Sequence, residues 1–108
     1  MNAVEIEEAI SALAEQQFDG AEFPYQFLRA FGNKETTIRK LRAGASNGSD
    51  LGGVLQRNHI HIAVVAAPGA VTQTLAALKI SPATAKAKAR FILSTDGTDF
   101  EAEDLESG

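Results

Sequence analysis

The sequence predicts an α+β domain, and three patterns along its 108 residues support that class. Apolar residues recur at helical spacing through most of residues 1–43, and strand-like alternation begins after residue 50. A helical pattern then separates two hairpin signals. We therefore expect about three N-terminal helices, then a four-stranded mixed sheet of two hairpins with an intervening helix. The length fits one domain over residues 1–108, with a helical part at 1–43 and a sheet part at 50–105.

The helical part divides into three segments. Apolar positions at helical spacing predict a first helix over residues 3–17. A second helix over residues 22–31 carries an aromatic stripe, which we interpret as core rather than as a platform for stacking bases. Asn33 is expected to cap a third helix over residues 34–43, because its side-chain oxygen can accept from the free N–H groups of the first turn.

The sheet part begins with residues 50–66, which read DLGGVLQRNHIHIAVVA. A hairpin turning at residues 57–58 is expected there, and its second strand has one clearly apolar face. A helix over residues 70–79 follows, and Ser81-Pro82 predicts a short helical start, since serine favours the N-cap and proline the first helical position. The second hairpin is predicted around residues 96–98.

Composition excludes several classes of protein. The chain has no cysteine, which rules out disulfides, zinc–thiolate sites and cysteine nucleophiles. The N-terminus lacks the basic and apolar regions of a signal peptide. No apolar run approaches the roughly 20 residues of a membrane span. We therefore expect a cytoplasmic protein with no membrane partner.

Charge is divided into three blocks. Residues 1–22 carry six acidic residues and no lysine or arginine, and residues 96–106 do the same. Residues 23–95 hold all ten basic residues with two acidic ones, a formal charge of +8. Such segregation can form a basic face for phosphate backbones. The acidic ends can equally fold over the basic middle and neutralise it, so both interpretations stay open.

Basic residues on the third predicted helix are the main candidate DNA contacts, because phosphate contacts need clustered cations. These candidates are Lys34, Arg39, Lys40 and Arg42. Arg57 at the first hairpin turn joins them, and Lys86, Lys88 and Arg90 are further candidates. A solvated helix face would have the same pattern.

Asp50, His59 and His61 are the weak candidates for a metal site. The two histidines are expected on one face of a strand, and two imidazoles can begin a transition-metal site. The pair is incomplete by itself, and an exposed strand edge is a commoner place for such residues. Asp50 follows Ser49 as a turn or capping residue would. We therefore predict no metal site and no catalytic residue.

Three stretches resemble the N-terminal domain of MmeI-like (type IIL) restriction–modification proteins and of related class I adenine-specific DNA methyltransferases. They read FLRAFGNKETTIRKL at residues 27–41, SDLGGVLQRNHIHIAVVA at residues 49–66 and ARFILSTDGTDFEAEDLESG at residues 89–108. The resemblance covers most of the chain. It implies a fold similar to a degenerate PD-(D/E)XK nuclease, a DNA partner, and a longer parent protein whose methyltransferase part uses S-adenosylmethionine. No cofactor is expected in residues 1–108.

In nuclease-bearing relatives, an aspartate at a strand start and a later Glu-x-Lys hold divalent metal. Here Asp50 is followed, where Glu-x-Lys would stand, by Ile60-His61-Ile62. The resemblance thus implies a non-catalytic N-terminal module that contacts DNA or positions the methyltransferase and target-recognition domains of its own chain. Two alternatives stay open, a docking domain without DNA contact and a divergent metal-dependent nuclease.

Overall fold

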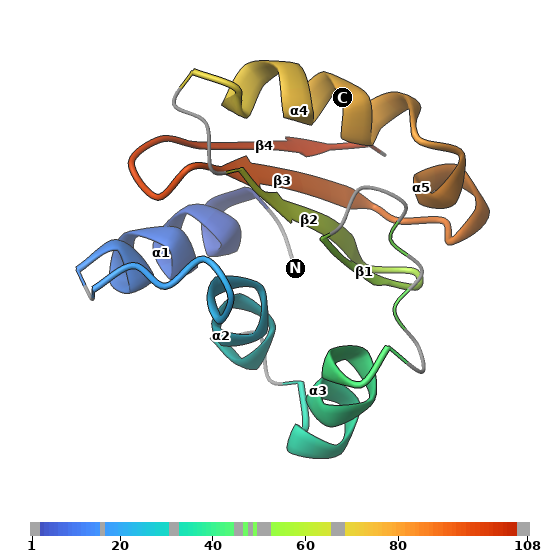
Figure 1. Ribbon diagram of the computed structural model, residues 1–108, viewed down its shortest axis with the longest axis horizontal. Helices are drawn as coiled ribbons and strands as arrows, with labels where there is room; N and C mark the ends of the chain where they lie inside the picture. The colour runs from blue at the N-terminus through green and yellow to red at the C-terminus, as the bar shows by residue number, and fades with distance from the viewer. Residues whose placement is uncertain are drawn as a thin grey trace.

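The computed structural model describes residues 3–15, 17–30, 33–44, 47, 49, 53–65 and 69–105. In this part of the chain three helices precede two hairpins that are separated by two further helices (Figure 1). The elements are α1 (Ala3–Ala14), α2 (Phe23–Ala30), α3 (Glu35–Arg42), β1 (Val54–Gln56), β2 (Ile60–Val64), α4 (Val71–Ile80), α5 (Pro82–Lys86), β3 (Phe91–Thr95) and β4 (Phe100–Asp104). This order confirms the predicted α+β class.

The four strands form one mixed sheet in the order β1-β2-β3-β4. β1 and β2 are antiparallel, with Val54 opposite Ile62, and β3 and β4 are antiparallel, with Leu93 opposite Ala102. The two hairpins meet at a parallel pair between β2 and β3. A parallel pair needs a long crossover, and α4 and α5 supply it. The predicted mixed sheet is confirmed, while its likeness to a nuclease fold stays a prediction.

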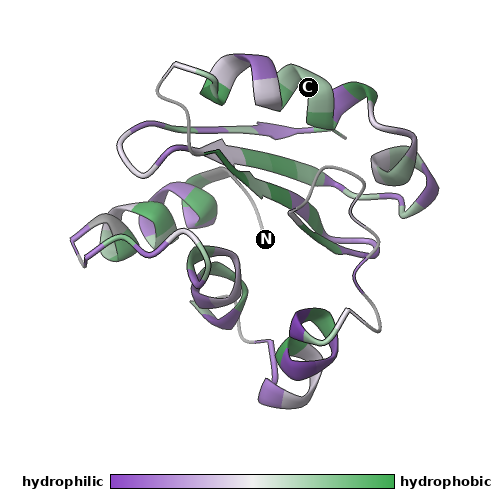
Figure 2. Ribbon diagram, viewed as in Figure 1, coloured by the Kyte–Doolittle hydropathy of each residue, from purple (hydrophilic) through white to green (hydrophobic). Residues whose placement is uncertain are grey.

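Helices cover both faces of the sheet (Figure 1). α1, α2 and α3 lie against one face, and α4 packs on the other across β2, β3 and β4. The larger core lies on the first face, where Phe27 and Leu41 meet Ile62. A smaller core under α4 contains Leu78 and Ile92. Hydrophobic residues run along β2 and β3 in Figure 2, as expected for central strands that are buried on both sides.

The aromatic stripe of α2 belongs to the core. Phe23 and Phe27 are buried, and their ring centroids lie 6.1 Å apart. The ring centroid of Phe23 also lies 5.5 Å from that of Phe100. The start of α2 therefore packs against β4, the edge strand of the sheet. The prediction of core is confirmed for Phe23 and Phe27, since neither buried ring can stack on a base. Phe31, the last residue of the predicted stripe, lies outside the described residues.

The expectation that His59 and His61 share one face of a strand at an exposed sheet edge is wrong. β2 begins at Ile60, so His59 lies in the preceding turn and is exposed. His61 is fully buried. It is covered from the side of α5, where Thr84 Oγ1 lies 2.8 Å from His61 Nδ1. The face that alternates with the apolar one is therefore also interior.

The predicted cap at Asn33 is also wrong. Lys34 occupies the N-cap position of α3 and makes no side-chain capping bond. The Asn33 amide instead donates to the Leu28 carbonyl at 2.9 Å and accepts from Gln56 Nε2 at 2.8 Å. Because the Asn33 side-chain oxygen accepts from Gln56 of β1, it does not cap α3. The predicted start at Ser81-Pro82 is confirmed, because the Ser81 hydroxyl caps α5.

None of the helices in the described ranges combines the length and the apolar character that crossing a membrane requires.

Candidate nucleic-acid interface

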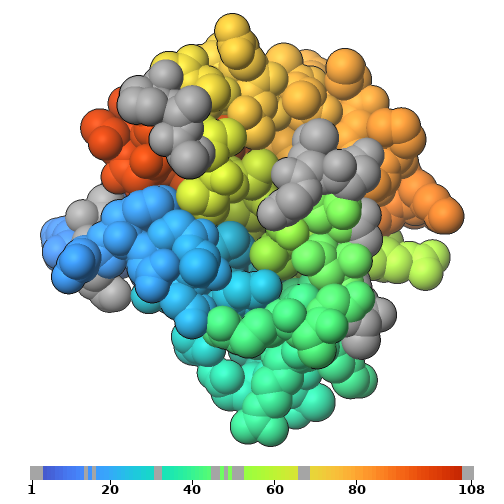
Figure 3. Space-filling view, viewed as in Figure 1, coloured from blue at the N-terminus to red at the C-terminus, as the bar shows by residue number. Residues whose placement is uncertain are grey.

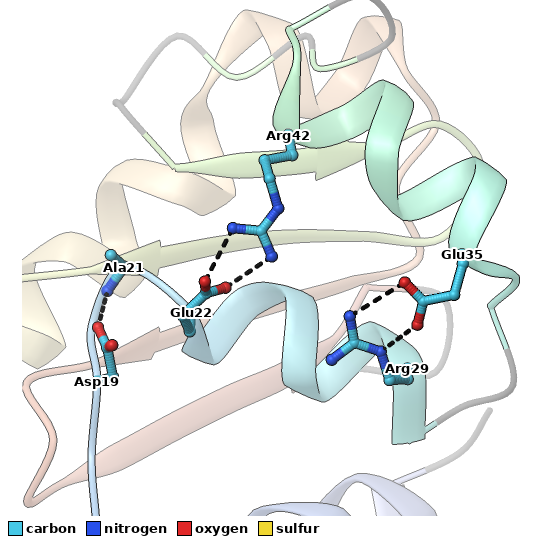
Figure 4. A network of polar contacts seen from close by, with 6 residues as sticks. All are labelled: Asp19, Ala21, Glu22, Arg29, Glu35 and Arg42. Carbon is cyan, nitrogen blue, oxygen red and sulfur yellow. Dashed lines mark hydrogen bonds and ion pairs between the residues drawn. The ribbon is translucent and has the colours of Figure 1, made fainter.

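Two ion pairs join α3 to α2 and to Glu22, the residue just before α2 (Figure 4). Arg42 donates to Glu22 through both terminal nitrogens, with Nη1 2.9 Å from Oε1 and Nη2 2.7 Å from Oε2. Arg29 donates to Glu35, with Nε 2.6 Å from Oε1 and Nη2 3.3 Å from Oε2. Both pairs use the planar, two-pronged geometry in which guanidinium and carboxylate match best. We call these four residues the helix clasp.

Arg42 is a predicted DNA contact that the fold turns toward α2. Besides its pair with Glu22, its guanidinium lies 4.3 Å from the centre of the Tyr25 ring. A DNA phosphate would have to displace Glu22 from the same nitrogens. We therefore leave Arg42 out of the candidate interface.

The helix clasp shifts the pKa values of Glu22, Glu35 and Arg42. The hydrogen bond from Arg42 lowers the pKa of Glu22 below its ordinary value of 4.5, and the hydrogen bond from Arg29 does the same for Glu35. The hydrogen bond that Arg42 donates to Glu22 raises the pKa of Arg42. Because the four side chains are solvent-exposed, the clasp orients α3 on α2 more than it stabilises the fold.

Acid should open the helix clasp. A carboxylate with a lowered folded-state pKa contributes stability above its unfolded pKa and loses it as pH falls through the folded pKa. We expect the stability difference between the wild type and the double variant Glu22→Gln, Glu35→Gln to be present at neutral pH. It should shrink as pH falls below 4.5. Urea unfolding at several pH values measures it, and a pH-independent difference would contradict the assignment.

The acidic end of the chain neutralises two further basic residues. Lys79 Nζ lies 3.0 Å from a Glu103 carboxylate oxygen, and Arg90 Nη2 lies 3.7 Å from Asp104 Oδ2. The predicted folding of acidic ends over the basic middle is thus correct for Lys79, Arg90 and Arg42. It does not extend to the rest of the basic block.

Six basic residues are exposed and form no ion pair with any carboxylate in the part of the chain that the structure describes. We call them the basic rim: Lys34, Arg39, Lys40, Arg57, Lys86 and Lys88. Four of them are among the predicted DNA contacts, and the two lysines near α5 are among the further candidates. The acidic ends therefore neutralise only part of the basic block, and a role of the basic rim as a face for phosphate backbones stays a prediction.

Two hydrogen bonds bring the three segments of the basic rim together. Gln56 Nε2 donates to Asn33 Oδ1, which places the end of β1 beside the start of α3. The Asn58 N–H donates to the Ala87 carbonyl at 2.8 Å, which places the β1–β2 turn against the connection from α5 to β3. In Figure 3 these segments follow the lower right of the molecule, from α3 past the yellow-green turn to the orange connection.

The two histidines among the metal candidates lie in different surroundings. His59 is exposed, whereas the buried His61 has Nε2 2.7 Å from Ser49 Oγ and Nδ1 2.8 Å from Thr84 Oγ1. Both ring nitrogens thus have hydroxyl partners, and binding a metal would break one of these contacts. Asp50 lies outside the described residues. Within those residues, no three histidine, aspartate or glutamate side chains come together as a metal site.

A family model for the N-terminal domain of MmeI matches residues 1–108, the whole of the sequence. The chain belongs to this family. The predicted resemblance is confirmed, and membership supports a module of a restriction–modification enzyme. No curated protein and no solved structure shows significant similarity to the chain.

In this MmeI N-terminal domain, a polar network that the sequence did not predict holds the segment before β1. The Asn47 side chain accepts from the N–H groups of Ser49 and Leu55 and donates to the Gly53 carbonyl. Ser49 Oγ accepts from the Gly53 N–H at 3.0 Å and reaches His61. The Asn-x-Ser spacing signals a local turn. The contact between Ser49 and His61 of β2 has no comparable signal in the sequence.

Proposed function

We propose that this MmeI N-terminal domain is a non-catalytic module that contacts the phosphate backbone of DNA through the basic rim. The observation that carries the proposal is a set of six exposed cations on three adjoining segments, none of which pairs with a carboxylate in the described ranges. The formal net charge of the chain is −4. If these cations had no role in binding a partner, we would expect the surplus acidic residues to pair with them. Here the acidic ends pair with other residues instead.

The flexible, exposed side chains of the basic rim favour backbone contact over reading of bases. Lysines dominate the set, and lysine acts on phosphate as a point charge rather than as a two-pronged reader of guanine. Contacts of this kind fix the position of a protein on a duplex and carry no sequence information. Sequence recognition is accordingly assigned to the target-recognition domain that the resemblance implies for the parent protein.

Catalysis is assigned to other parts of that protein. The buried His61 is engaged by Ser49 and Thr84, which disfavours a metal-dependent nuclease built on the two histidines. The resemblance implies methyl transfer from S-adenosylmethionine by a methyltransferase domain. The role proposed for residues 1–108 is to hold DNA in place for that domain.

Salt titration of duplex binding tests the proposal. We expect weak binding that is equal for two short duplexes of unrelated sequence, with a dissociation constant of about 10⁻⁴ to 10⁻⁶ M at physiological salt. The slope of log K against log salt should be about −0.9 per phosphate contact, and so no steeper than about −5 for six rim cations. Fluorescence anisotropy of a labelled duplex measures both quantities.

Two results would count against the proposal. Absence of binding even at low salt would show that the basic rim is a solvated surface. The duplex could also be nicked in a reaction that requires Mg²⁺ or Mn²⁺ and is abolished by Asp50→Ala. This result would show that the domain is a nuclease and not a non-catalytic module.

A further inference from the structure

The outer edge of β4 has backbone groups that no other described strand uses. The Leu105 N–H donates to the Arg90 carbonyl at 2.7 Å, so Leu105 is directed toward β3. Residues of an antiparallel strand alternate between pairs that exchange hydrogen bonds and pairs that do not. With Ala102 opposite Leu93, the N–H and C=O groups of Phe100 and Ala102 therefore point away from β3.

A groove of about 340 Å³ follows this edge between α1 and α4. On the α1 side its wall is apolar, with Ile6, Ile10 and Phe100. Ile6 belongs to the larger core, and Ile10 and Phe100 are half-buried against that core. Since side chains alternate across a strand, a chain laid along β4 would direct every second side chain to this apolar wall.

The other side of the edge is acidic. Glu101 and Glu103 face α4, where Glu101 accepts from the Thr72 hydroxyl at 2.6 Å and Glu103 pairs with Lys79. Glu7 of α1 also lines the groove. The carboxylates outnumber the cations, so an occupant gains from positive charge on the side chains that alternate with its apolar ones.

A second copy of the chain is a poor occupant for this edge. Antiparallel pairing of two β4 strands would bring Glu101 and Glu103 of each copy near those of the other. Like charges opposite each other destabilise a strand pair. Edge strands commonly carry charges that prevent self-association in this way.

We propose that β4 accepts an extended polypeptide segment with alternating apolar and basic side chains, which adds to the sheet as a fifth strand. The outward backbone groups of Phe100 and Ala102 supply the ladder. The groove receives the apolar side chains, and the carboxylates on the α4 side attract the basic ones. Recognition of this kind takes its affinity from main-chain hydrogen bonds and its specificity from alternate side chains. The site lies at the opposite sheet edge from β1 and does not depend on DNA contact.

The test uses three hexapeptides that alternate valine and lysine and are blocked at both ends. One is unmodified, one is N-methylated at every valine and one at every lysine. Alternate amides of an added strand face β4, so one methylated peptide should bind like the parent and the other should lose at least about tenfold in affinity. NMR titration of the 108-residue chain gives the dissociation constants and should place the shifts at residues 100–104.

The controls separate a fifth strand from plain charge attraction. A hexapeptide alternating valine and glutamate should not bind. Ala102→Pro removes an outward N–H and leaves the ladder with β3 intact, so it should weaken the parent peptide at least about tenfold while the circular dichroism spectrum stays unchanged. Equal binding of both methylated peptides, no binding of the parent, or a dimer of the free chain joined through β4 would each overturn the proposal. The peptide comparison decides the question even if the proline variant fails to fold.

Discussion

Replacing Ile62 by alanine is expected to lower the free energy of unfolding by about 2–5 kcal/mol. Ile62 has no exposed surface, pairs with Val54 of β1 and Leu93 of β3, and belongs to the larger core with Phe27. Alanine would leave a cavity that the neighbouring strands cannot close without moving. Since small domains are stable by about 5–15 kcal/mol, the loss would unfold a large fraction of the molecules at modest denaturant concentrations.

The same substitution at Ile80 is the matched control. Ile80 ends α4 with 82% of its surface exposed, so Ile80→Ala removes the same atoms from a site that buries almost none of them. Its effect should stay within about 0.5 kcal/mol of zero. Urea unfolding followed by circular dichroism, with equal m-values for both variants, measures the difference. Equal losses at the two positions would contradict the assignment of Ile62 to the sheet centre.

The architecture is largely predictable because its signals are local. Alternating residues in β2 indicate which side chains share a face, and the Asp96-Gly97 turn marks the second hairpin. Gly97 takes φ 95°, which glycine adopts without the strain that a side chain would bring. The burial of His61 was missed for the opposite reason. Its cover comes from α5, a distant element whose packing leaves no mark in the sequence around β2.

The candidate interface was half predictable. A block of ten basic residues with two acids predicts a basic surface from composition alone. Which cations remain unpaired depends on contacts between distant residues, such as Arg42 with Glu22. Asn33 shows the same limit, because the local rule for helix caps gave way to its bond with Gln56. The fold decides which of several possible partners a polar side chain binds. Sequence rules describe only the partners that are near in the sequence.

Removing the charges of the basic rim near the sheet end should abolish most duplex binding. We expect the triple variant Arg57→Gln, Lys86→Gln, Lys88→Gln to lower the affinity at low salt by at least about tenfold. Its salt slope should be less steep by about 3, because three fewer counterions are released at roughly 0.9 per lost phosphate contact. Glutamine keeps much of the side-chain length, and all three positions are exposed, so thermal unfolding should change little.

A variant with the same net charge, changed elsewhere, decides whether position or total charge matters. Ser11→Glu, Ala12→Glu, Gln73→Glu adds three negative charges at exposed positions on α1 and α4, and so matches the triple glutamine variant in formal charge. If the basic rim is the contact surface, this control should keep the affinity and slope of the wild type within about a factor of two near 0.15 M salt, where charges farther than a Debye length of about 8 Å from the DNA are screened. If both variants bound the duplex equally weakly, the loss would reflect repulsion by the net charge of the protein and not a specific contact surface.

A third variant, Lys34→Gln, Arg39→Gln, Lys40→Gln, then measures how far the contact extends along α3. A slope that falls by about 3 again would place the DNA across both ends of the rim, because each set of three cations would contribute its own phosphate contacts.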